Sequence, residues 1–331
     1  MTQSLVVGVD AGATSTRVAV HRLDGTRVGY AQAGAGNPTA HGTREAVAAV
    51  EQALVGALGE LAGSRVVASM AGVAGHVDEM VPALAEVWAA HGIAAPPRYT
   101  DDVLIGYAAG TPEPDGSLLL SGTGAVAGRI VDFELDAVAD GLGWLLADEG
   151  SGFWIGRRAV KGLIAALDRG LPAPSNDRLD RDLPAPHNGR GVLAESIVAH
   201  FLGDKRPGSP RETALRIVRQ AQAAPVRLAE VAALVNRAAE AGDPAALKIT
   251  DEAAGALVAM LRRVQAAGPV VLAGSVLTSE GPVRRAVIEL LAAERVSTAA
   301  DAAGAAAWLA ARPLLSEADA AACHAAFTAG T

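Results

Sequence analysis

The sequence is poor in cysteine, and this scarcity excludes several kinds of site. Cys323 is the single cysteine among 331 residues, so no disulfide can form within the chain. A cysteine zinc ribbon, or an iron–sulfur cluster held wholly by this chain, needs several thiolates and is excluded for the same reason.

Positive charge is also scarce. The 28 basic residues are outnumbered by 36 acidic ones, which gives a formal net charge of −8. Only three of the basic residues are lysines, namely Lys161, Lys205 and Lys248. The other 25 are arginines scattered along the chain. Binding to nucleic acid requires clustered cations that neutralise phosphates, so we expect no nucleic-acid partner.

Long hydrophobic runs are missing as well. Apolar stretches such as AALVNRAAEAGDPAAL are interrupted by charges before they reach the roughly 18 residues of a membrane-spanning candidate. The opening MTQSLVVGVDAGAT has no charged leading region and only a short apolar run, which is unlike a signal peptide. We therefore expect a cytoplasmic protein with no membrane partner.

What is present is a globular composition, with 50% apolar and 19% charged residues. At roughly 100–200 residues per domain, the length favours two domains, although one large α/β domain would also fit. The apolar runs Leu5–Val9 and Arg17–His21, followed by the turn Asp24-Gly25 and then Arg27–Ala31, predict three antiparallel strands. Further along the first half, two helices and two short strands are expected, at Arg44–Leu61 and Met80–His91 and at Val66–Ala71 and Arg98–Thr100.

The second half repeats the opening theme. After the linker TPEPDG, the string SLLLSGTGAVAGRIVD again predicts strand, Gly/Thr turn and strand, as a weak internal duplication. A Gly-rich loop over Gly141–Trp154, a mainly helical region, one further strand and two closing helices are expected after it. Those closing elements are Pro269–Ala273, Gly304–Ala311 and Glu317–Phe327. Two similar halves predict an α/β protein with a cleft between domains 1–112 and 113–331, the terminal helix packing back on the first domain.

The first chemical motif is VVGVDAGATSTRVAV. A buried strand ends at Asp10, and Ala11–Thr16 are small or hydroxylated, which lets backbone N–H groups approach an anion. Asp10 is an acceptor suited to hydrated Mg²⁺ that accompanies phosphates. The motif is neither a Walker loop nor a dinucleotide fingerprint. Taken alone, it also fits an ordinary hairpin with an aspartate in the turn.

The second motif, Ser121-Gly122-Thr123-Gly124, repeats this chemistry in the corresponding place of the second half. Two such loops suggest a clamp on one polyphosphate, although Gly and Thr also suit any tight turn. Gly274-Ser275 follows an apolar strand and suits a nucleotide ribose or base lying across backbone. Many strand–helix turns look similar.

Two acidic pairs complete the set of motifs. Asp101-Asp102 follows a short strand, where either residue could cap a helix or serve as a general base for a substrate hydroxyl. In GLGWLLADEGSGFWIG, Asp148 or Glu149 could hold polar substrate groups, with Ser151 capping the next helix. The alternative is that the whole string is a capping motif.

Together these motifs resemble the sugar-kinase/heat-shock-70/actin superfamily, which has two phosphate loops and an adenosine loop in this order. The chain resembles the BadF/BadG/BcrA/BcrD ATPase family nearly end to end, and especially its N-acetylglucosamine kinase branch. The most distinctive strings are VGVDAGATST, Asn37-Pro38, SGTGAVAGRI, ADEGSGFWIGRRAVK, EAGDPAALKI and VLAGSVL. The resemblance implies two ribonuclease-H-like (actin-like ATPase) domains with a nucleotide cleft between them.

The resemblance also implies roles for individual residues. ATP would be bound by Gly12, Ala13, Thr14, Ser15, Thr123, Gly124, Gly274 and Ser275, with Asp10 near Mg²⁺. Asp102 matches the catalytic aspartate, and Asp101 is the alternate if the register slips by one. Sugar contacts carry over to Asn37, Asp102, Thr123, Gly143, Asp148 and Glu149. We further expect the helix N-terminus to keep the Asp102 carboxylate ionised at neutral pH.

Three departures from the family pattern bear on the substrate. Leu142 stands where the family usually has Trp in Gly-Gly-Trp-Gly, and Ala147 replaces the first Gly of Gly-Asp-Glu-Gly-Ser. The loop Met70–Asp78 is poor in Ser and Asp donors. The family's activase branch is excluded, because Cys323 cannot supply cysteines for a cluster shared between subunits.

The function expected from the sequence is ATP-dependent phosphorylation of an amino sugar, first N-acetylglucosamine at its 6-hydroxyl, with ATP and Mg²⁺. Glucosamine or another hexosamine is the alternative acceptor. A non-catalytic ATP-binding or sugar-binding regulator of the same fold is the alternative class. The expected partner is a small-molecule amino sugar, and a homodimer is among the assemblies open to the chain.

Overall fold

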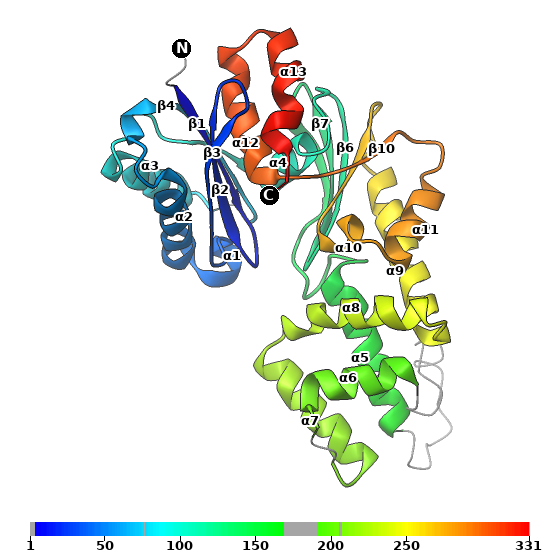
Figure 1. Ribbon diagram of the computed structural model, residues 1–331. Helices are drawn as coiled ribbons and strands as arrows, with labels where there is room; N and C mark the ends of the chain where they lie inside the picture. The colour runs from blue at the N-terminus through cyan, green and yellow to red at the C-terminus, as the bar shows by residue number, and fades with distance from the viewer. Residues whose placement is uncertain (1–3, 76, 169–190, 205–206, 331) are drawn as a thin grey trace.

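A computed structural model of the chain describes residues 4–75, 77–168, 191–204 and 207–330. Two five-stranded sheets dominate it. They lie side by side in the upper part of the molecule, while a group of helices extends below the second sheet (Figure 1). The Pro/Asp-rich stretch Leu171–His187 lies outside the described residues.

The first sheet has the order β3-β2-β1-β4-β5. Its strands are β1 (Leu5–Ala11), β2 (Thr16–Arg22), β3 (Arg27–Ala33), β4 (Val66–Val73) and β5 (Arg98–Asp101). The first three strands are antiparallel, whereas β4 and β5 run parallel to β1. One face is covered by α2 (Thr43–Leu58) and α3 (Met80–Ala90), around a core that includes Trp88. The short helix α1 (Pro38–His41) precedes α2.

The second sheet has the order β10-β9-β6-β7-β8. Its strands are β6 (Gly116–Ser121), β7 (Ala125–Val131), β8 (Glu134–Asp140), β9 (Val270–Ala273) and β10 (Val296–Thr298). As in the first sheet, the central strand and the two strands on one side of it form an antiparallel trio, and the two strands on its other side run parallel to it. The repeated topology explains the duplicated sequence pattern.

Two helices pack between the sheets, α4 (Asp102–Ala108) and α12 (Ala302–Ala311). Their apolar residues form one core cluster with side chains of both sheets, among them Val6 and Leu118. The approach of α12 to β1 is very close, because a Cβ added to Gly8 would lie 2.0 Å from the carbonyl oxygen of Ala303. Only glycine fits at that point of the strand.

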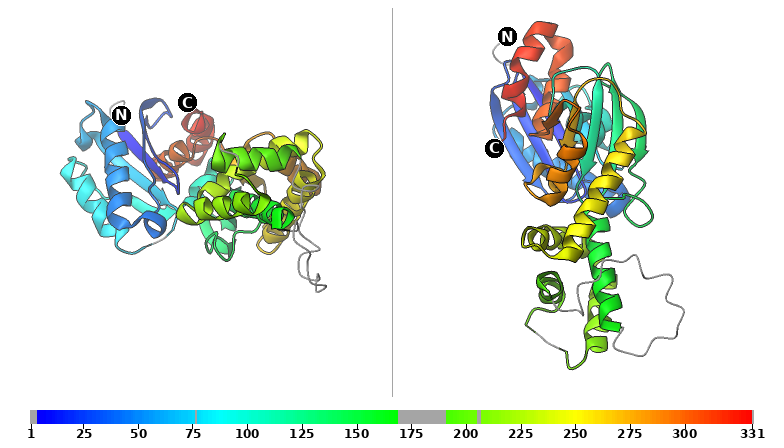
Figure 2. Two further views of the ribbon diagram at one scale, coloured as in Figure 1. Left: turned by 90° about the horizontal axis from the view of Figure 1, so that it is seen from below. Right: turned by 90° about the vertical axis from the view of Figure 1, so that its right-hand side faces the viewer.

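The remaining helices extend the second half. They are α5 (Gly152–Asp168), α6 (Val192–Leu202), α7 (Pro210–Ala223), α8 (Arg227–Glu240), α9 (Pro244–Arg262), α10 (Ser275–Thr278) and α11 (Pro282–Leu290). The lower part of α5 packs with α6, α7 and α8 as a helical lobe that projects away from both sheets (Figure 2). Its apolar side chains belong to the same core cluster as residues of the second sheet such as Leu119.

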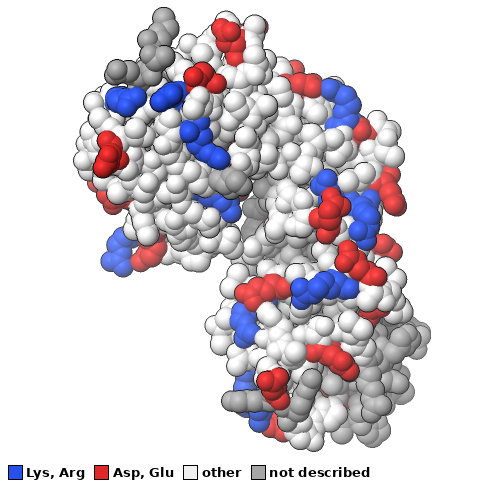
Figure 3. Space-filling model, viewed as in Figure 1, with Lys and Arg blue, Asp and Glu red and all other residues white. Residues whose placement is uncertain are grey.

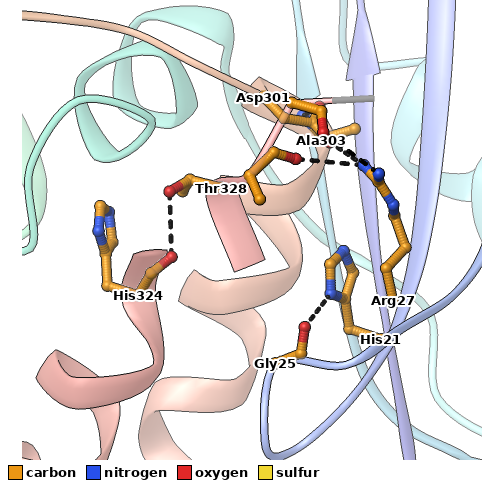
Figure 4. A network of polar contacts seen from close by, with 9 residues as sticks. His21, Gly25, Arg27, Asp301, Ala303, His324 and Thr328 are labelled. Atoms are coloured by element: carbon orange, nitrogen blue, oxygen red, sulfur yellow. Dashed lines mark hydrogen bonds and ion pairs between the residues drawn. The ribbon is translucent and has the colours of Figure 1, made fainter. Parts of the chain in front are cut away.

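The end of the chain returns to the first sheet. Helix α13 (Glu317–Thr328) packs on α12, and the ring of its Phe327 stacks on His21 of β2 with centroids 4.8 Å apart. Arg27 donates to the carbonyl of Ala329 at 3.2 Å and pairs with Asp301 at 3.5 Å (Figure 4). The first and last parts of the sequence are therefore held together by packing and by ionic contacts.

Most predicted elements are found within a few residues of their expected limits, but three expectations were wrong. Strand β8 was not expected. Only one strand was expected after the helical region, and the structure has two there, β9 and β10. The Gly-rich loop ends earlier than expected, because α5 already begins at Gly152. None of the described helices is long and apolar enough to cross a membrane.

Candidate active site

In the first sheet, acidic side chains gather where parallel strands end. Strands β1, β4 and β5 run in the same direction, so Asp10 near the end of β1 and Asp101 at the end of β5 lie at one edge of the sheet. Asp102 begins α4 directly after β5. Ligands of open α/β sheets bind at this carboxyl edge of the strands.

Asp102 is half-buried at this edge. Burial is the main cause that raises the pKa of its carboxyl to about 7, and the charges of Asp10 and Asp101 add to it. The backbone N–H groups of Asp102 and Val103 lower the pKa, but they do not outweigh burial. The expectation that the helix N-terminus keeps this carboxylate ionised was therefore wrong. A carboxyl with a pKa near 7 suits a general base.

The side chain of Asp101 does not cap the helix that follows it. Asp101 occupies the cap position of α4, but its side chain makes no capping hydrogen bond. Asp102 is already inside the first helical turn. The capping interpretation was therefore wrong for Asp101, whereas the carboxylate of Asp102 interacts with backbone N–H groups in the first turn of α4.

Asp10 is paired with Arg17. The two residues are direct cross-strand partners in the β1–β2 ladder, and Arg17 donates to Asp10 Oδ2 at 3.2 Å. Burial raises the pKa of Asp10, while the guanidinium opposes that rise. The ion pair was not anticipated from the sequence, although the hairpin register would have revealed it.

The first loop, between β1 and β2, is tied to its surroundings by backbone hydrogen bonds. The N–H of Gly12 donates to the carbonyl of Ser15 at 3.0 Å, and the N–H of Gly36 donates to the carbonyl of Gly12 at 2.9 Å. Thr14 is exposed, Ala13 is half-buried, and Ser15 is buried. The loop is thus a tight turn that presents Thr14 to solvent.

Asn37 directly follows Gly36, whose N–H binds the first loop, and it caps the helix α1. Its Oδ1 accepts a hydrogen bond from the N–H of Ala40 at 3.1 Å and so caps α1. A Cβ on Gly75 would lie 2.7 Å from the same oxygen. The side-chain amide group is the part of Asn37 that remains for the predicted sugar contact.

The second loop, Ser121–Gly124, is anchored to the start of α5. Gly152 donates to the carbonyl of Gly122 at 2.8 Å, and Phe153 donates to that of Thr123 at 3.3 Å. The Ser121 hydroxyl donates to the carbonyl of Gly150 at 3.0 Å. These bonds fix the loop against the helix, and Ser151 caps that helix by accepting from the N–H of Trp154 at 3.1 Å, as expected.

Gly274 brings the predicted adenosine turn against this second loop. Its φ is +79°, and an added Cβ would lie 2.4 Å from the carbonyl oxygen of Ser121. Ser275 begins α10 directly after it. The parallel pairing of β9 with β6 places both turns at one edge of the second sheet. This position therefore requires glycine for its backbone conformation and for its close packing.

Asp148 connects the second loop with the segment that follows β8. It is 4% exposed, has a φ of +59°, and accepts from the N–H of Gly143 at 3.1 Å. Burial is the main cause that raises its pKa, and the Gly143 bond opposes that rise. A Cβ on Gly124 would lie 2.4 Å from its Oδ2. Glycine is thus needed at position 124 because a side chain there would collide with the Asp148 carboxylate. The phosphate-loop interpretation did not predict this contact.

Gly143 and Glu149 are both exposed, the former with a φ of +105°. One residue of this region was missed as a functional candidate. Asp140 ends β8, and its carboxylate accepts from the N–H groups of Asp148 and Glu149. The pair Asp140-Gly141, which is typical of a turn, was the signal available in the sequence.

The residues fit a magnesium ion that is held chiefly by phosphate oxygens and water. Among the described residues there is no group of three or more His, Cys, Asp or Glu side chains that could hold a metal. Mg²⁺ in phosphate-transfer sites usually needs one or two carboxylates besides the phosphates. Asp10, near the carboxyl end of β1, can supply such an oxygen.

The predicted site residues thus fall into two groups, one at the edge of each sheet. A hollow separates the upper lobe that holds the first sheet from the lower helical lobe on the face in Figure 3. Basic and acidic side chains are interspersed over that face rather than gathered in one basic patch. Glycine-rich turns of this kind suit phosphate groups because their backbone N–H groups can approach an anion closely.

The paired sheets of repeated topology, joined through α4 and α12, are those of the actin-like ATPase fold. The chain belongs to the BadF/BadG/BcrA/BcrD ATPase family, whose model matches residues 7–308. No protein of curated function matches the sequence.

Solved structures show the same fold at low sequence identity. A protein from Chromobacterium violaceum, provisionally named N-acetylglucosamine kinase, superposes with a TM-score of 0.68 at 23% identity, over 93% of this chain and 99% of that one. A provisional N-acetylglucosamine kinase from Porphyromonas gingivalis gives a TM-score of 0.60 at 18% identity, over 98% of both chains. A ROK family glucokinase from Streptomyces griseus, in complex with glucose and AMPPNP, gives 0.55 at 20% identity, over 94% of this chain and 99% of that one.

Proposed function

We propose that this protein is a sugar kinase that transfers the γ-phosphoryl group of ATP to an amino sugar, most specifically to the 6-hydroxyl of N-acetylglucosamine. The observation that carries the proposal is Asp102, whose pKa is raised to about 7 at the carboxyl edge of the first sheet. Membership of an ATPase family supports ATP as the donor. The similar fold of proteins named as kinases for N-acetylglucosamine and glucose supports a sugar as the acceptor.

In the proposed reaction, Asp102 accepts the proton of the sugar hydroxyl or orients its oxygen for in-line attack on phosphorus. The loops Ala11–Ser15 and Ser121–Gly124 bind the phosphates through backbone N–H groups, and Gly274 and Ser275 lie along the adenosine. Mg²⁺, when bound with ATP near Asp10, supplies positive charge that stabilises the transferring phosphoryl group.

The amino sugar would bind next to Asp102, between the two groups of site residues. The carboxylate of Asp148, the amide group of Asn37, and Thr123, Gly143 and Glu149 are the proposed contacts. Sugar binding would draw domains 1–112 and 113–331 together and exclude water, which limits wasteful ATP hydrolysis. The cytoplasm, where ATP is available, is the compartment that suits this reaction.

The test is a panel of hexoses and hexosamines assayed for ADP release with Mg²⁺-ATP. We expect turnover with amino sugars, N-acetylglucosamine above glucosamine, and phosphate at the 6-hydroxyl of the product. An absence of sugar-dependent ADP release over the whole panel would overturn the kinase proposal. Nucleotide binding without turnover would then favour the non-catalytic ATP-binding alternative.

A further inference from the structure

Asp140 is built into the base of the loop that carries the proposed sugar contacts. It is the last residue of β8, and residues 141–147 follow it as an irregular segment before Asp148. Its Oδ1 accepts from the N–H of Asp148 at 2.9 Å, and its Oδ2 accepts from the N–H of Glu149 at 3.3 Å. One carboxylate thereby closes the loop by holding two consecutive backbone amides.

Asp148 is one of the two residues whose backbone N–H groups Asp140 holds, and its contacts show why its position matters. Asp148 has a left-handed backbone, with a φ of +59°, and it is buried. Its side chain reaches the N–H of Gly143 on one side and lies against Gly124 of the second phosphate loop on the other. The left-handed backbone of Asp148 sets this position of its carboxylate, and the hydrogen bond that the N–H of Asp148 donates to Asp140 holds the main chain in place.

The residue type at position 140 fits this task closely. Its φ is +65°, a region that glycine, asparagine and aspartate tolerate better than other residues. Glycine would satisfy the backbone but offer no acceptor, and asparagine would offer one acceptor oxygen. A carboxylate offers two, and both are used.

The electrostatics indicate that the role of Asp140 is geometric. The negative charge of Asp140 raises the pKa of Asp148, so it opposes ionisation of that carboxyl. A residue whose task was to keep Asp148 charged would carry the opposite sign. What Asp140 contributes is the fixed position of two N–H groups.

We propose that Asp140 is a positioning residue for sugar binding, which holds Asp148 and Glu149 in the orientation that meets the sugar hydroxyls. This inference rests on the proposed sugar-kinase function. It assigns to Asp140 a part in substrate affinity, while phosphoryl transfer itself belongs to Asp102.

The experiment compares Asp140→Gly and Asp140→Asn with the unaltered protein. Glycine removes both acceptors without straining the positive φ, and asparagine retains one. We expect the KM for the sugar to rise about tenfold or more in Asp140→Gly, since charge-assisted hydrogen bonds are lost. It should rise less in Asp140→Asn, while the KM for ATP stays within about twofold in both.

Asp132→Gly is the matched control. Asp132 lies in the turn at the other end of β8, is exposed, and also has a positive φ of +51°. Its replacement removes an aspartate from the same backbone conformation away from the loop, so the sugar KM should not change.

Amide hydrogen–deuterium exchange supplies a second readout that needs no catalysis. Peptides containing Asp148 and Glu149 should exchange faster in Asp140→Gly than in the unaltered protein or in Asp132→Gly. Unchanged exchange and an unchanged sugar KM would overturn the inference, as would an equal rise of both KM values, which marks a general loss of structure. If the unaltered protein shows no sugar-dependent turnover, the proposed function fails, and the exchange data alone decide whether Asp140 fixes the loop.

Discussion

At the scale of single residues, Asp102 shows how burial decides the chemistry of a side chain. A carboxyl at a helix N-terminus is normally favoured in its ionised form. At this sheet edge, low solvation and two neighbouring carboxylates outweigh that effect and raise the pKa of Asp102 to about 7. Its protonation state therefore changes near neutral pH, which leads to three predictions.

Asp102→Asn should lose most of its kcat while it retains ATP binding. Removal of a general base typically lowers the rate by about 10²–10⁴-fold. Asp101→Asn is the matched control and should keep much of its activity. Steady-state kinetics and nucleotide titration would check both variants. The reverse pattern would mean that Asp101 is the base.

The activity of the unaltered protein should depend on pH through the same group. Below a pH of about 7 the Asp102 carboxyl is protonated and cannot accept a proton from the sugar. The value of kcat/KM for the sugar should therefore rise with pH and reach a plateau above this pKa. A pH–rate profile measures it, and a profile flat from pH 5 to 8 would contradict the assignment.

Asp102→Asn should also be more stable than the unaltered protein at alkaline pH. The pKa of Asp102 is about 7 in the folded state, against 3.8 for an aspartate side chain exposed to water, as in the unfolded chain. Between these values the folded protein binds more protons than the unfolded one, so its stability falls as pH rises. At pH 8 the variant should gain about 1 kcal/mol or more in free energy of unfolding, and the gain should shrink toward pH 5. Urea unfolding at both pH values checks this, and an equal difference at both would contradict it.

At the scale of elements, the two predicted phosphate loops differ in how their glycines are used. Around Gly12, an added Cβ would meet the carbonyl oxygen of Ser15 at 3.4 Å, which is an ordinary contact. At Gly124 it would lie 2.4 Å from Asp148 Oδ2. The sequence shows both as glycines in hairpin turns, but only the second touches the proposed sugar contacts.

Gly124→Ala should therefore raise the KM for the sugar as well as that for ATP. The added methyl group displaces the Asp148 carboxylate, and we expect a rise of about tenfold in the sugar KM. Gly12→Ala is the control, and its effect should be confined to ATP. Separate KM measurements for each substrate distinguish the two, and an unchanged sugar KM in Gly124→Ala would contradict the role of Asp148.

Local sequence patterns predicted most elements because their apolar periodicity is strong. Strand β10 was missed because its three residues are too few to show alternation. Strand β8, with the sequence ELDAVAD, alternates between exposed and half-buried positions but carries three acidic residues, which masked it. The pairing of Asp10 with Arg17 follows from hairpin register, whereas the raised pKa of Asp102 depends on packing from distant parts of the chain and has no local signal.

At the scale of the whole molecule, the end of the chain secures the first sheet. Asp301 is buried before α12, and Arg27 of β3 pairs with it and also binds the carbonyl of Ala329 (Figure 4). A buried carboxylate that loses its partner is costly. This contact joins residues at opposite ends of the sequence.

Arg27→Ala should lower the free energy of unfolding by about 1–3 kcal/mol, because Asp301 would lose a charged partner while it stays buried. Arg22→Ala is the matched control, since Arg22 is an exposed arginine of the neighbouring strand β2. Urea unfolding of the two variants at one pH provides the comparison. Equal stabilities would show that the Arg27 contact contributes nothing.

The close packing of α12 against Gly8 of β1 also has a consequence for folding during synthesis. Strand β1 is translated long before the helix that covers one of its faces, because β1 ends at Ala11 and α12 begins only at Ala302. During synthesis, the apolar face of the first sheet that α12 covers stays exposed until α12 itself has been translated. Such exposed surface is prone to aggregation. The nascent chain should therefore depend on chaperones until α12 emerges, and a fragment that ends before α12 should not fold on its own.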